Sequence, residues 1–178
     1  MSYRQFRASL QKPALIAVAE HWNAARRGRL MPAWRDIDPQ AIKKYLSIVW
    51  AWRWDAGLAT FIGRLAGEDN IAIIGTNTHG KKVEECFPPG AYELVKARLM
   101  RVIEGPELMR SGGRIRLISG REGHGDRIIL PLAEDGAHAD GIIGVTVYKL
   151  GVRPRMGDAS IDPFHEAVDF FPLGDAAA

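Results

Sequence analysis

The fold class is decided by the stretch Ile48-Val-Trp-Ala-Trp-Arg-Trp-Asp-Ala-Gly-Leu-Ala-Thr-Phe-Ile-Gly-Arg-Leu-Ala66. Large apolar side chains occupy every second position of its first half, namely Ile48, Trp50, Trp52 and Trp54. A period of two is typical of a β-strand. Asp55-Ala-Gly57 has the composition of a turn, and residues 59–66 form a second strand-like run. The stretch therefore predicts two antiparallel strands, the first with three tryptophans on one face.

The residues before this hairpin predict helices. Apolar residues recur at helical spacing at Leu10, Ala14, Val18, Trp22 and Ala25. Pro13 suits the first turn of such a helix, and Gly28, after two arginines, suits its end. We expect this helix to span Ser9–Arg27, followed by a short helix that begins at Asp38-Pro39.

Further helices and then strands follow the hairpin. Two short helical pieces are expected around Glu68–Ile74 and Lys81–Phe87, and a longer helix contains the apolar face of Tyr92, Val95, Leu99, Val102 and Ile103. Gly105-Pro106 ends that helix. Alternating or apolar runs then predict three more strands, at residues 114–117, 127–132 and 141–148, with turns at 120–125 and 134–136. Because short turns join consecutive strands, we predict the α+β class with a five-stranded antiparallel sheet and helices on one face.

Composition excludes several classes of protein. The chain has 178 residues, 47% of them hydrophobic and 25% charged, which suits one compact domain. No apolar run approaches the roughly 20 residues needed to span a bilayer. No export signal is found, so a cytoplasmic location is expected. The single cysteine, Cys86, cannot form an internal disulfide.

Charge is distributed unevenly along the chain. Residues 1–53 carry a net charge of +7, and residues from Met156 onward carry −5. The basic head is either a nucleic-acid surface or a solvated helical face whose arginines complement a helix end. Because no nucleic-acid-reading motif accompanies the cations, no nucleic acid is predicted as a partner. A contact between the head and the acidic tail remains open.

The segment Gly75-Thr-Asn-Thr-His-Gly-Lys-Lys82 resembles a phosphate-binding loop. It lacks the Ser or Thr that must follow the lysine to hold magnesium, because Lys82 occupies that position. A loop with two turn glycines is the simpler interpretation. A nucleotide-binding protein that uses Gly75–Lys82 is kept as the alternative function.

No catalytic or metal-binding residues are predicted. The five histidines have no metal-ligand spacing, and Cys86 lies in a semi-apolar segment typical of a core residue. The face of Trp50, Trp52 and Trp54 either lines a ligand cavity or covers the sheet beneath the N-terminal helix. Arg64 is a charge in an apolar strand, so it must reach solvent, a carboxylate or a ligand.

Four sequence motifs accompany the order of predicted elements, namely Trp22…Arg26-Arg-Gly-Arg-Leu-Met-Pro32…Arg35-Asp-Ile-Asp-Pro39, Phe61-x-x-Arg64-Leu-x-Gly67, Gly75…Gly80-Lys81, and Leu130-Pro-Leu132…Asp135-Gly136…Ile143-Gly144. The order of elements resembles a PAS domain, and the motifs resemble the stand-alone bacterial PAS-like proteins. The resemblance covers about residues 15–150. At Gly63 the family usually has an aromatic residue, a departure that would enlarge a pocket or loosen the strand.

The resemblance implies a non-catalytic sensory or regulatory module in bacterial signalling, without haem or flavin. It places a small-ligand cavity between the sheet and the helices, and the residues expected around it are Arg64, Trp52, Trp54, His79, Phe87 and Tyr92. We expect a helical extension at residues 1–45, the PAS-like domain at 46–150 and an acidic tail at 151–178. A signalling protein is the expected partner.

The N-terminal helix Ser9–Arg27 has a broad apolar side. Exposed apolar surface of this kind tends to mark contacts. We therefore expect a homodimer through this helix, which the family resemblance also implies. The alternative is that the helix folds back on the tryptophan face of its own sheet.

Overall fold

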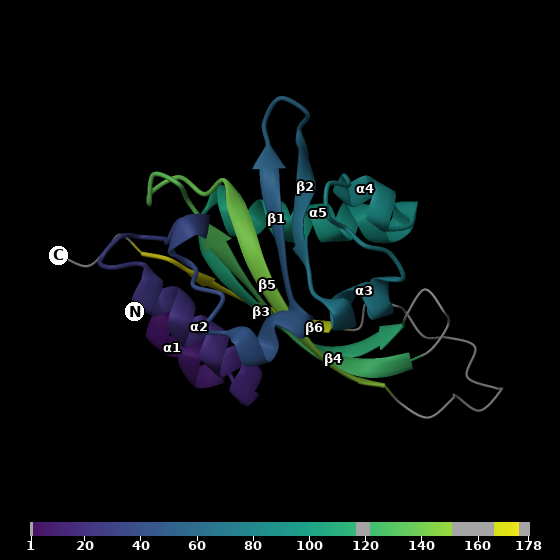
Figure 1. The fold of residues 1–178 in the computed structure, drawn as a ribbon, viewed down its shortest axis with the longest axis horizontal. Coiled ribbons are helices and arrows are strands. Elements are labelled where there is room, and N and C mark those ends of the chain that lie inside the picture. The colour runs from purple at the N-terminus through teal and green to yellow at the C-terminus, as the bar shows by residue number, and fades with distance from the viewer. Residues whose placement is uncertain (1, 117–121, 151–165, 175–178) are drawn as a thin grey trace.

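The computed structural model describes residues 2–116, 122–150 and 166–174. Its centre is an antiparallel six-stranded sheet with the strand order β2-β1-β5-β4-β3-β6 (Figure 1). The strands are β1 (Val49–Asp55), β2 (Thr60–Ala66), β3 (Glu107–Arg116), β4 (Glu122–Leu132), β5 (Gly141–Leu150) and β6 (Glu166–Pro172).

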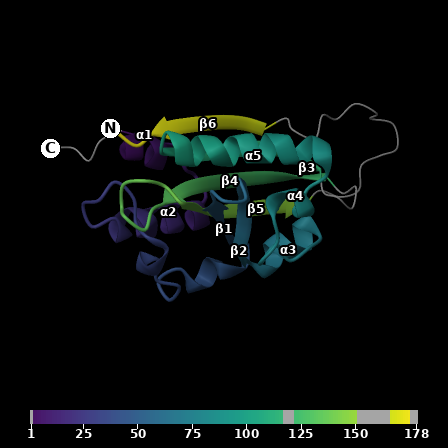
Figure 2. The same cartoon turned by 90° about the horizontal axis from the view of Figure 1, so that it is seen from above.

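Helices lie on both faces of this sheet. They are α1 (Ser2–Ser9), α2 (Pro13–Ala25), α3 (Glu68–Ile74), α4 (Val83–Cys86) and α5 (Pro89–Glu104), with 3₁₀ turns η1 (Trp34–Asp36) and η2 (Lys43–Ile48). Figure 2 shows α2 and α5 on opposite sides of the sheet. None of the helices in the described part of the chain is both long and apolar enough to cross a membrane.

The predicted α+β class, antiparallel sheet and N-terminal helix are confirmed. Two details differ from the prediction: the sheet has a sixth strand, and helices cover both of its faces. The sixth strand, β6, lies within the region expected to be an acidic tail. Its Phe170 and Phe171 contribute to the apolar clusters on opposite faces. The edge strand β6 therefore packs apolar side chains against the helices on both faces of the sheet.

Strands β3 and β4 begin earlier than predicted, at Glu107 and Glu122, and the start of β4 lies within the segment 120–125 that was predicted to be a turn. Gly113 pairs with Gly125, and Gly112 pairs with Asp126. Glycine has low strand propensity, so the sequence pattern there favoured a turn. Pairing with neighbouring strands satisfies the backbone hydrogen bonds and overrides that weak local preference.

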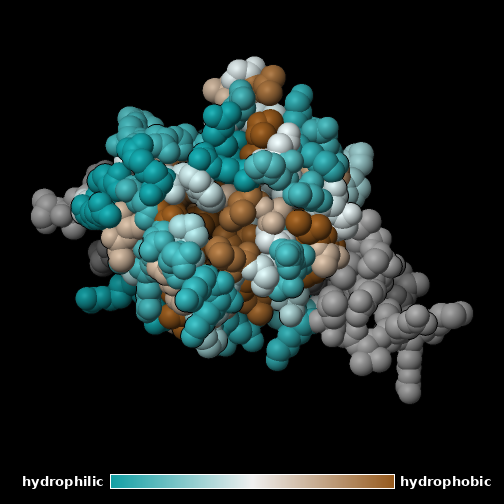
Figure 3. Space-filling view, in the orientation of Figure 1, coloured by the Kyte–Doolittle hydropathy of each residue, from teal (hydrophilic) through white to brown (hydrophobic). Residues whose placement is uncertain are grey.

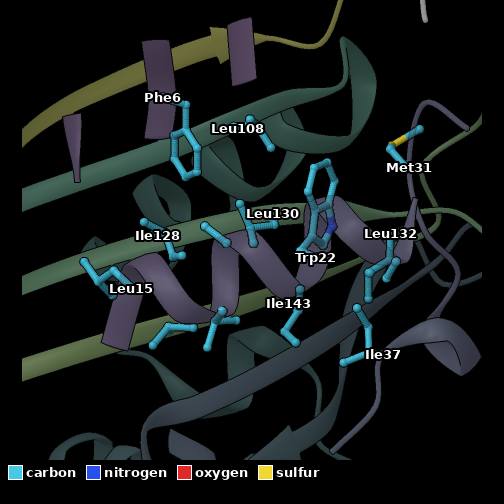
Figure 4. Packing of buried hydrophobic residues seen from close by; sticks show 14 of the residues in the cluster. Phe6, Leu15, Trp22, Met31, Ile37, Leu108, Ile128, Leu130, Leu132 and Ile143 are labelled. Carbon is cyan, nitrogen blue, oxygen red and sulfur yellow. The ribbon is translucent and has the colours of Figure 1, made fainter. Parts of the chain in front are cut away.

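The strands bury alternate residues on opposite faces. On β4, Ile128 faces α2, whereas Ile129 faces α5; on β5, Ile143 faces α2, whereas Ile142 faces α5. Figure 4 shows the α2 side, where Phe6, Leu15 and Trp22 meet the sheet residues. We call this cluster the α2 core and the cluster on the other face the α5 core. Each face of the sheet therefore has its own hydrophobic core.

The N-terminal segment forms two helices where one was predicted. A helix over Ser2–Ser9 precedes Pro13, whose ring suits the first turn of α2. Apolar residues of both helices are buried against the sheet, including Phe6, Leu15, Val18 and Trp22, and so is Leu10 between the helices. Trp22 is fully buried, and its Nε1 donates a 2.9 Å hydrogen bond to the Pro131 carbonyl.

This packing corrects two expectations about the helix. The apolar side expected to be exposed for dimerisation is already covered by the chain's own sheet. The helix also does not lie on the tryptophan face, because Trp50 and Trp52 belong to the α5 core. The residue alternation explains this second point, since Val49 and Ala51 point opposite to the tryptophans.

Half of the ten cations in residues 1–53 form ion pairs with other described residues of the chain. The pairs are Arg7 with Glu20, Lys12 with Asp126, Arg29 with Asp36, Arg35 with Glu134 and Arg53 with Asp55. The Arg29 pair belongs to a junction in which Met31 N–H donates to the Gly136 carbonyl at 3.2 Å. The stretch around Arg29 therefore docks the N-terminal segment on the β4–β5 loop.

In Figure 3, hydrophilic residues surround a hydrophobic area in the middle of the face. Among the described residues, the exposed large hydrophobic ones are Leu46 and Leu58, with 36% and 56% of their surface accessible. Leu58 lies in the β1–β2 turn, where Leu58 N–H donates to Asp55 Oδ1 at 3.1 Å. The predicted turn at Asp55–Gly57 is thereby confirmed.

The β4–β5 loop carries a carboxylate whose protonation can be tested. Asp135 accepts hydrogen bonds from the backbone N–H groups of His138 and Ala137, and it contacts the His138 ring at 2.7 Å. These contacts lower the pKa of Asp135 to about 2. Because the folded pKa is depressed, the stabilisation by Asp135 is complete above the ordinary value of 3.8 and disappears as the pH falls through about 2.

An NMR titration of the side-chain carboxyl carbons checks this expectation. The Asp135 signal, assigned by its loss in Asp135→Asn, should titrate near pH 2. A midpoint at the ordinary value of 3.8 would contradict it.

Candidate functional site

Four of the six predicted site residues meet on the α5 side of the sheet. Trp52, on β1, has 4% of its surface exposed and belongs to the α5 core. Trp54, Phe87 and Tyr92 are half-buried and pack against the same cluster. These four aromatic residues come from β1, from the end of α4 and from the first turn of α5. Residues that are distant in sequence thus form one aromatic cluster on the α5 side of the sheet.

Arg64 and His79 lie elsewhere. The Arg64 side chain is exposed, and its Cζ lies 4.7 Å from the centroid of the Trp34 ring, which packs against the α2 core. His79 is also exposed, and its Nδ1 is 2.7 Å from the Arg64 carbonyl oxygen. The structure therefore brings these two residues together, apart from the four aromatic residues.

A register shift explains the position of Arg64. Trp52 pairs with Gly63, but the preceding Ala51 pairs with Leu65, so Arg64 is an extra residue in β2. Such a bulge re-aims side chains relative to the regular alternation. The spacing of residues in the sequence gives no sign of this bulge, so it predicts a regular strand at Arg64.

The space beside Gly63 is filled by backbone and is not an enlarged pocket. Gly63 N–H donates to the Lys81 carbonyl at 2.9 Å, and Gly80 N–H donates to the Gly63 carbonyl at 2.8 Å. A Cβ at position 63 would lie 1.9 Å from the carbonyl oxygen of Thr78. Glycine is required here because the 78–81 segment lies directly against β2.

The Gly75–Lys82 loop does not have the architecture of a phosphate-binding loop. A helix, α3, precedes it where such a loop follows a strand, and α4 after it has only four residues. Gly75 ends α3 with φ of 84°. The Lys81 Nζ donates to Thr76 Oγ1 at 2.5 Å. The nucleotide-binding alternative therefore loses its structural basis, and the loop covers the edge of β2.

Buried polar side chains accompany the aromatic residues. Thr146 has 1% of its surface exposed, and its Oγ1 accepts hydrogen bonds from Trp50 Nε1 at 2.9 Å and from Arg127 Nε at 3.2 Å. The buried hydroxyls of Thr78 and Ser111 have no hydrogen-bond partner among the described residues. Sequence reasoning missed Thr78, Ser111 and Thr146, because a Ser or Thr in a loop or a strand carries no recognisable signal.

Two titratable groups near this region have shifted pKa values. Thr60 donates a 2.5 Å hydrogen bond to Glu84 Oε2, and this contact lowers the pKa of Glu84. Burial raises the pKa of Cys86, which keeps the thiol protonated and unreactive at neutral pH. Cys86 belongs to the α5 core, as the sequence predicted for a small core residue.

The position of Trp50 depends on Gly144. A Cβ at residue 144 would lie 2.1 Å from Cζ2 of Trp50, so the indole lies directly on this glycine. Gly144→Ala is expected to displace the ring, break its hydrogen bond to Thr146 and destabilise the fold by about 1–3 kcal/mol. Urea unfolding and near-ultraviolet circular dichroism measure both effects. Gly90→Ala is the control, because nothing lies within 4 Å of its Cβ.

A comparison of the sequence with models of known protein families gives a match over most of the chain. The sequence model of the PAS domain matches residues 10–147. The chain belongs to the PAS domain family. This match includes α2 and extends across the boundary at residue 45 that was expected to separate a helical extension. No curated protein matches the chain.

Solved structures similar to this PAS protein have low sequence identity to it. A Vibrio cholerae VqmA dimer without target DNA is 14% identical with a TM-score of 0.49, and the match covers 62% of this chain and 49% of VqmA. VqmA bound to DPO is 14% identical with a TM-score of 0.48, and the match covers 62% and 56% of the two chains. The PAS chain thus spans about half the length of VqmA.

A PAS domain from Colwellia psychrerythraea is 15% identical with a TM-score of 0.43. That match covers 61% of this chain and 92% of the Colwellia chain. Membership of the PAS family supports a sensory module as the general role of the protein.

Proposed function

We propose that this PAS protein senses a small organic molecule that binds in the α5 core, and that it passes the signal to a partner protein in the bacterial cytoplasm without catalysis. Trp52, Trp54, Phe87 and Tyr92 would contact the ligand. Arg64 and His79 have no place in this site, because they lie at the outer edge of β2.

The observation that carries the proposal is the combination of aromatic walls with buried, unpartnered hydroxyls. Small-molecule sites are mostly apolar and contain a few placed polar groups. In the described part of the chain, Thr78 and Ser111 are the buried side chains whose oxygens have no partner. A buried polar group without a partner is unfavourable and calls for an explanation. A bound molecule would supply the missing hydrogen bonds.

The aromatic residues suit a ligand with a flat apolar body. Trp54 and Phe61 are in ring contact, with centroids 4.9 Å apart, and both adjoin the α5 core. Tyr92 lies on the first turn of α5 and is half-buried. A ligand entering beside α5 would meet these rings first.

Native mass spectrometry of the full chain as purified from bacteria tests the proposal. A bound small molecule should appear as an added mass that is lost on denaturation. Tyr92→Ala should reduce its occupancy, whereas Tyr45→Ala, a half-buried tyrosine on the α2 side, should not. The proposal fails if the protein has only its own mass and no compound from a metabolite library raises its melting temperature.

A further inference from the structure

The polar side chains of the α5 core form a row across three neighbouring strands. Thr146 on β5 pairs with Arg127 on β4, and Arg127 pairs with Ser111 on β3. Residues paired in this way point to the same face, so all three lie on the α5 side of the sheet. The Trp50 indole reaches the Thr146 end of the row.

Two hydrogen-bond donors point at the hydroxyl oxygen of Thr146. Its hydroxyl oxygen accepts from Trp50 Nε1 and from Arg127 Nε, which uses both of its lone pairs. Its remaining capacity is therefore its own O–H, which can only donate. Among the described residues, no group accepts a hydrogen bond from this hydroxyl, although Thr146 has only 1% of its surface exposed.

Ser111 is the second buried hydroxyl of the row, and it can both donate and accept a hydrogen bond. The residue has 2% of its surface exposed, and its hydroxyl has no partner in the described part of the chain. Neighbouring strands are about 4.8 Å apart, so Ser111 and Thr146 lie about 10 Å from each other, on either side of Arg127. The row therefore offers a donor at Thr146 and, about 10 Å away, a hydroxyl at Ser111 that can donate or accept.

We infer that the ligand of the proposed sensor is a small aromatic or similarly flat molecule that presents acceptor oxygens, as a ketone or carboxylate does, to Thr146 and Ser111. This inference rests on the proposed function. The apolar body of the ligand lies against Trp52 and the α5 core, and each acceptor oxygen accepts from an unused O–H group. A molecule whose polar group only donates, such as an ammonium group, finds no acceptor at Thr146, whose lone pairs are already used.

Ligand-observed NMR with matched fragments tests the ligand class. The fragments are acetophenone, benzoate, benzylamine and toluene, which share one ring and differ in the polar group. Acetophenone or benzoate should bind more tightly than benzylamine and toluene. One carbonyl or carboxylate group reaches only one of two hydroxyls that lie about 10 Å apart, so at least one of Thr146→Val and Ser111→Ala should weaken that binding by about tenfold, the effect of one lost hydrogen bond. Thr146→Ser, which restores a hydroxyl, should bind like the wild type.

The controls separate this inference from the proposed function. Ser47→Ala removes an exposed hydroxyl that pairs with Asp69, and it should leave fragment binding unchanged. Circular dichroism establishes that each variant is folded. If benzylamine and toluene bind as well as acetophenone and benzoate, the inferred ligand class is wrong, but the proposed function as a sensor still stands. If a ligand found in the purified protein has no acceptor atom, the inference is likewise overturned. If no fragment binds and no ligand is found, the proposed function itself fails.

Discussion

Gly63→Ala is expected to destabilise the protein by about 3 kcal/mol, at the upper end of the cost of inserting a methyl group into packed structure. The new Cβ would lie 1.9 Å from the carbonyl oxygen of Thr78 and 2.7 Å from its carbonyl carbon. Both atoms are backbone, so the 78–81 segment would have to leave β2 and lose its two hydrogen bonds to Gly63. Urea unfolding measures the loss.

Gly90→Ala is the matched control for this substitution. Residue 90 lies near the start of α5 with nothing within 4 Å of its Cβ, so alanine should be neutral or stabilising by about 0.5–1 kcal/mol. Equal stability of Gly63→Ala and the wild type would show that the 78–81 segment does not pack on β2 as described.

Trp22→Ala is expected to cost about 3–5 kcal/mol, as truncation of a buried tryptophan usually does. The side chain is fully buried between α2 and the sheet, and it loses its hydrogen bond to the Pro131 carbonyl. Trp22→Phe should cost less, because the aromatic ring remains. Thermal unfolding followed by circular dichroism gives both values.

Charged substitutions on α2 distinguish intramolecular packing from a dimer interface. Val18 is 1% exposed in the α2 core, so Val18→Glu should unfold the chain. Glu20→Ala, on the exposed side of the same helix, should remain folded. A Val18→Glu protein that is folded and monomeric, from a dimeric wild type, would show that α2 packs on a second copy.

Several site features could be predicted from the sequence because they depend on residues close in the chain. The period-two run from Ile48 predicts a strand and places Trp50, Trp52 and Trp54 on one face, which the structure confirms. Phe87 and Tyr92 were assigned to the same site through the family resemblance. The separation of Arg64 from these aromatic residues could not be predicted, because a β-bulge is a property of strand pairing and the local pattern around Arg64 contains no sign of it.

The sequence by itself determined the α+β class, the hairpin after Ile48, the apolar faces of α2 and α5, and membership of the PAS family. Hydrophobic period and turn chemistry are local, so they can be read from neighbouring residues. Only the tertiary structure decided which face each helix covers, that β6 joins the sheet, and that Ser111, Arg127 and Thr146 form one buried row. Those outcomes depend on strand register and on contacts between residues distant in sequence, and the free energy of such contacts exists only once the chain has folded.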